Sequence, residues 1–411
     1  MDNVWKKRAQ TALMVMFGGV ALIFVFVLGL WLYVSATSKP LHPNPGEVPS
    51  VASAKGAQQW SGSIEHARQI ALAHLVDKNL PGLSVAVGVG GNIVWAEGFG
   101  WADLEKRIKV SPDTQFRIGT ASVALTSAAV GVLLEKRQLN LDDEIQTYVP
   151  SYPKKQWPVT LRQLMAHVAG VRNDGGDEGP LLSQHCEHPV DALRSFGDSA
   201  LLFEPGTAFH YSSYAWILVS AAVEAAADDE PFLTFMRRQI FTPLGMERTR
   251  ADSATDAIAD KATAYFPRFA AEPKYGPDLM REIDYSCYAG SSVFLSTPSD
   301  LVRFATAINS GKLLQPGTVQ LLQAPQRLSS GQETGYGLGW DLETVTLAGK
   351  ATQWVGHDGQ LLGGMVASLM TFTEAGIVIA VISNTSYADT ESLGVKIAET
   401  FAGQANASSR K

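Results

Sequence analysis

The sequence predicts a mixed α/β protein of the α+β type, preceded by one N-terminal transmembrane helix. Residues typical of β-strands gather near the start of the body and again after Gly335. Segments with helical spacing fill the region between them. Strands at both ends with helices between favour one sheet assembled from the two ends, with a helical insert. The transmembrane helix is predicted from an uncharged apolar stretch within the first forty residues.

Composition and charge narrow the class of protein further. The chain has 411 residues, of which 46% are apolar and 18% charged. These values exclude wholesale disorder and collagen-like repeats. With 33 Lys and Arg against 40 Asp and Glu, the formal net charge is −7. An acidic balance without a clustered basic face argues against a nucleic-acid partner.

The N-terminal segment has the length of a membrane anchor. The stretch from Ala12 to Val34 is uncharged, and at about 1.5 Å per residue it would cross a hydrocarbon core of roughly 30 Å. The basic residues before it, which predict that this end stays in the cytoplasm, are Lys6, Lys7 and Arg8. Two aromatic residues that favour the membrane interface lie near its far end, Trp31 and Tyr33. A cleaved signal peptide is the alternative, but its apolar core is usually only ~7–15 residues long.

The chain divides by composition into five segments. In order, they are a cytoplasmic basic tail (1–11), a transmembrane anchor (12–35), a Pro-rich linker (36–59), a folded body (60–402) and a disordered tail (403–411). The prolines of the linker predict a semi-extended spacer that holds the body off the bilayer.

Within the body, a helical pattern begins at Ser61 and stops before Pro81. Two β-rich runs, 83–89 and 93–96, surround Gly-Gly-Asn and predict a hairpin. The helical patterns that follow are 121–136, 160–167, 214–226, 231–240 and 299–310. The closing part contains β-rich segments at 336–342, 364–371 and 377–383, and a helix around 390–401.

Three stretches contain candidate functional residues: 116–126 at the mouth of an apolar helix, 203–214, and Gly356-His357-Asp358-Gly359. Together with supporting motifs they strongly resemble the serine β-lactamase and penicillin-binding-protein superfamily, over about residues 60–402. The supporting motifs are 82–87, 159–167, 336–340 and Gly363-Gly364. Class C β-lactamases, related esterases and D-amino-acid peptidases are similar, as is a lactamase-like branch in animal mitochondria.

The resemblance implies a β-lactamase/transpeptidase-like antiparallel sheet flanked by helices, with an all-helical subdomain and a site between the two. It also implies acyl transfer, in which a serine attacks an amide or ester carbonyl and a lysine one turn later helps take the proton. The expected substrate is a small molecule or peptide, such as a cell-wall fragment or a small ester, and no cofactor is expected. The expected setting is a bacterial inner membrane with the body in the periplasm, although an organelle would suit a mitochondrial relative.

Carried over residue by residue, the family's catalytic pair changes in this chain. The nucleophile position is Thr120 and the lysine position is Val123. Tyr211 is kept for proton transfer, and Ser213 stands where an Asn is usual, as a substrate-lining residue. A tyrosine without a nearby cation has a pKa near ~10, so losing the lysine costs on the order of 4 kcal/mol at neutral pH.

The third motif is His357-Asp358-Gly359 in place of Lys-Thr-Gly, on an edge strand that lines the substrate. A protonated His357 would restore part of the missing positive charge, and Asp358 and Gly359 would line the substrate. The backbone N–H groups of Thr120 and Gln360 match the oxyanion-hole positions. Two hypotheses follow: a divergent hydrolase with impaired or altered activity, or a pseudoenzyme that uses the cleft for binding or scaffolding.

Several of these residues also have a purely structural interpretation. Thr120 could be a helix N-cap, the third motif could be a turn, and His167 could be an ordinary core histidine. Cys186 could pair with Cys287 in an oxidising compartment, or both could be buried thiols. No metal site is expected, because the His-Cys-Glu-His run at 185–188 lacks the usual ligand spacing and a fourth partner.

Overall fold

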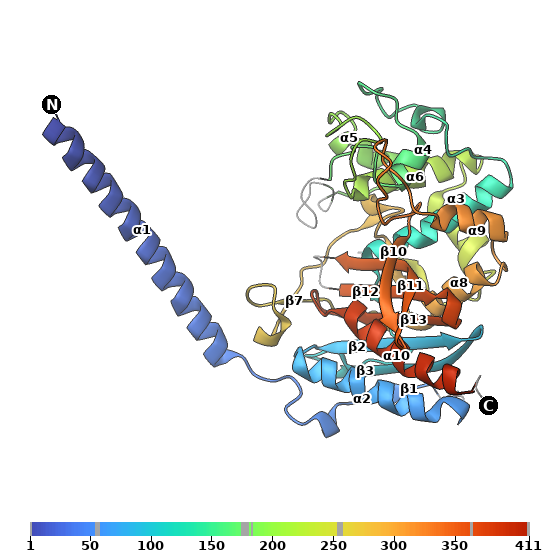
Figure 1. The fold of residues 1–411 in the computed structure, drawn as a ribbon, viewed down its shortest axis with the longest axis horizontal. Helices are drawn as coiled ribbons and strands as arrows, with labels where there is room; N and C mark the ends of the chain where they lie inside the picture. Colours follow the sequence, from blue (N-terminus) through green and yellow to red (C-terminus); the bar gives the residue numbers. More distant parts are fainter. Residues whose placement is uncertain are drawn as a thin grey trace.

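The N-terminal helix stands apart from the body in the computed structural model, which describes residues 2–53, 58–173, 181, 184–252, 258–361 and 365–408. Helix α1 (Asp2–Thr37) extends away from the rest of the chain, and only its C-terminal end approaches the body (Figure 1). Within the described residues, the segment Thr11–Thr37 is the one helix long and apolar enough to cross a membrane.

The body is built on an antiparallel sheet with the strand order β1-β3-β2-β13-β12-β11-β10. These strands are β1 (Ser50–Ala52), β2 (Gly82–Val89), β3 (Asn92–Asp103), β10 (Asp341–Leu347), β11 (Lys350–Leu361), β12 (Met365–Phe372) and β13 (Ile377–Ser383). The two ends of the body meet where β13 pairs with β2, with Ala380 opposite Ala86. One sheet assembled from both ends of the body is therefore confirmed.

Helices cover both faces of this sheet. Val85 and Ile379 pack into one apolar cluster with α2 (Ser61–Asp77) and α10 (Thr390–Ser408). Their neighbours Ala86 and Ala380 face the opposite way, into the cluster that contains α8 (Pro298–Asn309). Because successive side chains point to opposite faces, a sheet covered on both sides needs apolar residues at every position. The strands β2, β12 and β13 accordingly appear as nearly continuous apolar runs in the sequence.

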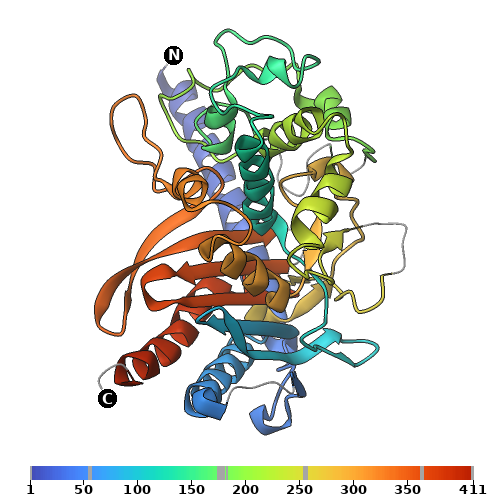
Figure 2. The same ribbon diagram turned by 90° about the vertical axis from the view of Figure 1, so that its right-hand side faces the viewer.

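A helical part lies beside the sheet and is inserted between the two sets of strands (Figure 2). Its elements include α3 (Ser122–Glu135), α4 (Leu161–Met165), α5 (Leu193–Phe196), α6 (Ser213–Ala226), α7 (Phe232–Met236) and α9 (Pro316–Gln323). Helix α3 is buried from Ser122 to Leu133 and packs against α6. The expected all-helical subdomain is therefore present.

The remaining strands of the body are short. They are β4 (Ile108–Lys109), β5 (Phe116–Arg117), β6 (Arg250–Ala251), β7 (Tyr265–Pro267), β8 (Pro277–Leu279) and β9 (Phe294–Ser296). Strand β4 pairs with β3 of the large sheet, and β7 pairs with β8. Strand β9 lies between β5 and β6 in a small three-stranded sheet. This sheet places β5, and the chain that follows it, at the junction with the helical part.

The strand predicted at 336–342 begins only at Asp341, in β10. Gly339 has a φ of 93°, a left-handed conformation that interrupts an extended strand, and a Cβ there would meet the Trp216 ring at 2.6 Å. Strand β11 was absent from the β-rich pattern because glycines and polar residues interrupt its apolar run. Residues 356–359 lie within β11, in agreement with the strand that the family resemblance implies, so the alternative interpretation of this motif as a turn is wrong.

The expected linker is in contact with the body. Leu41 donates its N–H to the side chain of Asn79 at 2.7 Å, and His42 is buried. Strand β1 joins the sheet beside β3, so much of 36–59 forms part of the folded body; its residues 54–57 lie outside the described ranges. At the other end, α10 continues to Ser408 through most of the expected tail, and 409–411 also lie outside.

Cys186 and Cys287 form a disulfide that bridges 101 residues of chain. Of the two interpretations that the sequence left open, the structure therefore has the paired one. The bond ties the segment before α5 to the loop that precedes β9.

Removing this disulfide should destabilise the body. A cross-link that closes a loop of this length restricts the unfolded chain, and its loss typically costs roughly 2–5 kcal/mol. Urea unfolding of the Cys186→Ser/Cys287→Ser variant should show a free energy of unfolding lower by that amount. Dithiothreitol should lower the midpoint urea concentration of the parent protein and leave that of the variant unchanged. Equal midpoints for the parent and the variant without dithiothreitol would contradict the assignment.

Candidate active site

Thr120 lies in a short 3₁₀ turn, Gly119–Ala121, between β5 and α3. Its hydroxyl donates a hydrogen bond to the main-chain oxygen of Asp358 in β11, at 3.0 Å. Helix α3 begins at Ser122 with Ala121 as its N-cap, and no side chain caps it. Thr120 is therefore not the N-cap of α3, and its hydroxyl joins the turn to the sheet.

Gly359 allows the strand to approach this turn closely. A Cβ at Gly359 would lie 1.9 Å from the carbonyl oxygen of Ile118 and 2.7 Å from the N of Ala121. Both are backbone atoms, so a side chain could be accepted only by moving the strand or the turn. The glycine thus brings the main chain of β11 to within hydrogen-bonding distance of Thr120.

Beyond Gly356, one edge of β11 is free of the neighbouring strand. Strand β10 pairs with β11 only as far as Asp341 opposite Gly356, whereas pairing with β12 continues through Gln360. The N–H of Asp358 donates to the Asp341 carboxylate at 3.1 Å, on the edge away from β12. Because backbone groups alternate along a strand, the N–H of Gln360 points to that same edge. This is the side on which Thr120 lies.

Tyr211 reaches the site from the chain just before α6. Its ring stacks on His167, with centroids 4.0 Å apart. Burial raises the pKa of Tyr211 well above its ordinary value, although the neighbouring Thr120 hydroxyl acts to lower it. The phenol oxygen is buried and makes no hydrogen bond of ordinary geometry within the described part of the chain. Tyr211 is thus a protonated phenol at neutral pH, beside Thr120.

His357 is held by contacts at both ring nitrogens. Nε2 lies 2.9 Å from the Tyr336 hydroxyl, and Nδ1 lies 2.7 Å from the main-chain oxygen of Asp358. The carboxylate of Asp341 is 3.7 Å from Nδ1. Both groups near Nδ1 are acceptors, so we assign the proton to Nδ1 and let Nε2 accept from Tyr336. The ring of His357 is 6.3 Å from that of Tyr211, centroid to centroid.

Tyr336 and Asp341 were not identified as site residues from the sequence. Tyr336 belongs to a motif that supported the family resemblance, but the motif gives no direction for its side chain. Asp341 immediately follows that motif, and only the pairing of β10 with β11 brings it to His357. A register of two strands is a long-range property, so no local pattern identifies either contact.

The other expected residues lie around this centre. Val123 is fully buried in the apolar core, one helical turn after Thr120. Ser213 is the first residue of α6, and its N–H donates to the side chain of Asn173 at 3.2 Å. The structure thus brings Thr120, Tyr211 and His357 together.

The side chain of Asp358 takes a different direction from that of His357. Burial raises the pKa of the Asp358 carboxyl to about 6, against a lowering by Ser368 and Glu391. Ser368 lies opposite Asp358 on the neighbouring strand β12, and Glu391 lies at the start of α10. Asp358 therefore contacts Thr120 and His357 through its main-chain oxygen, while its carboxyl group faces α10.

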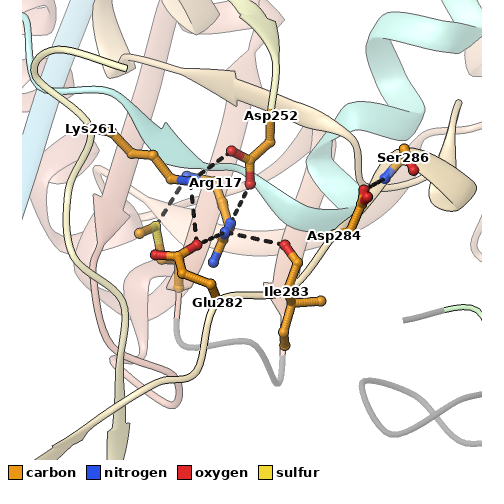
Figure 3. Close-up of polar contacts among 8 residues, drawn as sticks. Arg117, Asp252, Lys261, Glu282, Ile283, Asp284 and Ser286 are labelled. Atoms are coloured by element: carbon orange, nitrogen blue, oxygen red, sulfur yellow. Dashed lines mark hydrogen bonds and ion pairs between the residues drawn. The ribbon is translucent and has the colours of Figure 1, made fainter. Parts of the chain in front are cut away.

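A buried ion-pair network holds the chain just before Thr120 (Figure 3). Arg117 in β5 donates to Asp252 at 2.5 Å and to Glu282 at 3.1 Å. Lys261 also contacts Asp252, at 2.8 Å. Burial opposes the charge on Arg117, but Asp252 outweighs this and raises the pKa of the guanidinium. The network fixes β5 three residues before Thr120.

The two histidines of the 185–188 run are committed to separate carboxylates. His185 lies 2.7 Å from Asp284, and His188 lies 2.8 Å from Glu224. The hydrogen bond with Glu224 favours the charged form of His188 and raises the pKa of that imidazole. Over the described residues, no group of three or more His, Cys, Asp or Glu side chains is arranged to hold a metal ion.

This fold and site define a class of protein. The model of the Beta-lactamase family matches residues 67–402, and the chain belongs to that family.

The individual relatives that the chain resembles have low sequence identity to it. The chain is 25% identical to the mitochondrial serine beta-lactamase-like protein LACTB of Mus musculus, over 88% of this chain and 84% of that protein. It is 26% identical to penicillin-binding protein 4* of Bacillus subtilis, over 67% of this chain and 62% of that protein. The solved structure of FmtA from Staphylococcus aureus shares the fold, with a TM-score of 0.69 and 20% identity over 89% of this chain and 93% of that one.

The network around Arg117 should be important for stability. Replacing Arg117 by Met removes the buried partner of the Asp252 carboxylate and leaves it with the ion pair to Lys261. Breaking a buried ion pair costs about 3–5 kcal/mol. The free energy of unfolding, from urea denaturation followed by circular dichroism, should fall by this amount. Arg250→Met, at an exposed arginine of β6, should change it by less than about 0.5 kcal/mol. Similar losses in both variants would contradict a special role for Arg117.

Proposed function

We propose that this protein is a membrane-anchored hydrolase that cleaves amide or ester bonds by acyl transfer, at a reduced rate. Its substrate would be a small molecule or peptide, such as a cell-wall fragment or a small ester. The convergence of Thr120, Tyr211 and His357 on one place is the observation that supports this proposal most. They come from three separate segments, as a nucleophile, a proton carrier and a basic group must in this family's chemistry.

In the proposed reaction, the Thr120 oxygen attacks the substrate carbonyl and its proton passes to the ionised form of Tyr211. The tetrahedral oxyanion accepts hydrogen bonds from the backbone N–H groups of Thr120 and Gln360. Tyr211 then returns the proton to the leaving amine or alkoxide as its bond to the carbonyl carbon breaks. Water releases the acyl group from Thr120 in the reverse sense.

Two features make this reaction slow. The Thr120 hydroxyl donates to the main-chain oxygen of Asp358, which cannot take its proton, so the hydroxyl must turn toward Tyr211 before it reacts. Burial raises the pKa of Tyr211 above its ordinary value, so the ionised form is rare. A phenol with a pKa of ~10 already costs on the order of 4 kcal/mol at neutral pH. Val123 supplies no charge to offset that cost.

In the proposed reaction, His357 partly takes the place of a lysine in the third motif, and contacts with three residues position it. Asp341 and the Asp358 oxygen fix the proton on Nδ1, and Tyr336 holds Nε2. This arrangement keeps the ring next to Tyr211. We assign Asp341 and Tyr336 as positioning residues, because each acts through His357.

A second candidate function is a pseudoenzyme that binds a ligand or partner in the same cleft. The hydrogen bond from Thr120 to Asp358 supports it, because that bond gives the hydroxyl a structural role. The buried Val123 supports it as well, since an apolar side chain replaces the base.

The anchor is also proposed. The apolar span Thr11–Thr37 would cross the inner membrane of a bacterium once, with the basic N-terminus inside and the body in the periplasm. The disulfide between Cys186 and Cys287 supports an oxidising compartment. A mitochondrial setting, as in the name of the LACTB relatives, is the alternative.

A fluorescent acyl probe and a panel of p-nitrophenyl esters test the reaction on the full chain in detergent. Thr120→Ala should abolish labelling and turnover, because it removes the attacking oxygen. Thr147→Ala, at an exposed threonine, should leave both unchanged. Turnover that survives Thr120→Ala would eliminate the proposed mechanism.

Restoring the serine and the lysine of the family at positions 120 and 123 distinguishes the hydrolase hypothesis from the pseudoenzyme hypothesis. Thr120→Ser with Val123→Lys should raise ester turnover by about 10³-fold, since a nearby amine removes on the order of 4 kcal/mol. Far-ultraviolet circular dichroism checks that the buried lysine leaves the fold intact. An unlabelled parent protein and a labelled, folded repaired variant would favour the pseudoenzyme.

The role of the positioning residues can be tested by removing one contact at a time. Tyr336→Phe keeps the ring but removes the partner of Nε2, and Asp341→Asn removes the carboxylate near Nδ1. Each should lower kcat by roughly ten-fold, about 1.4 kcal/mol, with little change in KM. The ¹⁵N shifts of His357, assigned by comparison with His357→Gln, should show loss of the Nδ1–H tautomer preference in Asp341→Asn. Unchanged shifts would reduce Asp341 to a structural role.

A further inference from the structure

A hairpin of the body reaches back to the membrane-facing helix. Strands β7 and β8 pair with Phe266 opposite Asp278, and the segment 265–279 lies between the end of α1 and the sheet (Figure 1). Tyr265 fixes the base of this hairpin, since its N–H donates to the Asn384 oxygen at 2.9 Å. Its hydroxyl accepts from the N–H of Leu104 at 2.8 Å. The hairpin is therefore attached to the body at its base.

At its other end, the hairpin is hydrogen-bonded to α1. The indole N–H of Trp31 donates to the Tyr275 hydroxyl at 3.1 Å, and the Ser38 hydroxyl donates to the Tyr275 main-chain oxygen at 2.9 Å. The Phe269 ring packs edge-on against Tyr275 at 5.6 Å. Tyr275 is thus held between the helix and the rest of the hairpin.

Arg268 stabilises the C-terminus of α1. Its guanidinium donates to the Val34 oxygen at 3.2 Å and to the Thr37 hydroxyl at 2.9 Å. The last carbonyls of a helix lack partners within the helix and carry partial negative charge. The Val34 oxygen already accepts the N–H of Ser38, the residue after the helix, at 2.9 Å, so Arg268 adds a second donor and a positive charge at this helix end.

These contacts place the hairpin at the depth of the membrane interface. Trp31 lies six residues before Thr37, the end of the apolar span, so Tyr275 reaches about 9 Å back along the helix at 1.5 Å per residue. Tryptophan and tyrosine side chains concentrate at that level of a bilayer. A segment bonded to Trp31 cannot stand above the headgroups while α1 crosses the bilayer.

The exposed residues of the hairpin suit this position. Leu279 is 68% exposed, although it is a large apolar side chain. Lys274 is exposed, and its ammonium lies 5.1 Å from the Tyr275 ring centroid. Lys274 is also ion-paired to the exposed Glu272 at 3.6 Å. Interfacial segments combine apolar side chains, which reach the acyl chains, with aromatic rings and cations, which lie at the level of the lipid phosphates.

We propose that the hairpin 265–279 is a second membrane contact, which inserts into the headgroup layer of the same bilayer that α1 crosses. The partner is the phospholipid interface. The inference rests on the proposed anchor and is independent of the proposed reaction. The body would then lie directly on the membrane in one orientation, instead of hanging from a spacer.

Depth-dependent fluorescence quenching tests this proposal on the full chain in phosphatidylcholine vesicles. Both cysteines of the sequence are in the disulfide, so an introduced cysteine is a unique labelling site. Leu279→Cys carrying an NBD fluorophore should show blue-shifted emission and be quenched more by a doxyl group near the headgroup than by one near the acyl terminus. Lys312→Cys, an exposed position after α8, should be quenched by neither.

Tyr33→Cys reports on the anchor separately. Quenching at Tyr33→Cys together with Leu279→Cys supports the proposal, whereas quenching at Tyr33→Cys alone overturns it and leaves the anchor standing. Quenching at Leu279→Cys alone supports a membrane contact of the hairpin and overturns the anchor. Quenching at neither position overturns both.

Discussion

The close approach of the turn Gly119–Ala121 to strand β11 is the constraint on which the site depends. It exists because position 359 has no side chain, and a single Cβ there would lie 1.9 Å from the Ile118 oxygen. The hydrogen bond from Thr120 to Asp358 closes the gap between the two elements. Through this junction the helical part and the sheet share one boundary, and the segments that carry Tyr211 and His357 meet there. The ion pair of Arg117 with Asp252 supports the junction from behind, because it fixes the chain that enters the turn.

The same junction creates a conflict between stability and reactivity. The hydroxyl that would attack a substrate is also the donor that joins the turn to the strand, and it must give up this bond to react. A lysine at position 123 would compensate by stabilising the ionised oxygen, but Val123 is buried in the apolar core, where it contributes packing instead. Natural sequences usually break local rules at functional sites and compensate elsewhere. In the proposed reaction the compensating group is His357, whose ring contacts Asp341 and Tyr336.

Much of the fold could be predicted because its signals are local or were carried by the family motifs. The apolar runs of β2, β12 and β13, and the helices α2, α3, α6, α8 and α10, follow from the spacing of apolar residues. Strand β11 could not be found in this way, since Gly356 and Gly359 interrupt it, and both are required by close backbone neighbours from distant segments. The contacts of His357 with Tyr336 and Asp341 depend on strand register, which no short pattern encodes. The packing of the linker depends likewise on Asn79 and on β3, which lie far along the chain from the prolines.

The strand order of the large sheet connects the N-terminal end of the chain to the candidate site. The linker forms β1 at one edge, and the strands that border the site are β11 and β10 at the other edge. Every strand between them is hydrogen-bonded to its neighbours, so the two edges belong to one continuous sheet. The hairpin 265–279 adds a second attachment, because Tyr265 is bonded to Asn384, the residue that follows β13. If α1 crosses a bilayer as proposed, these two attachments would determine the direction in which the site faces relative to that bilayer.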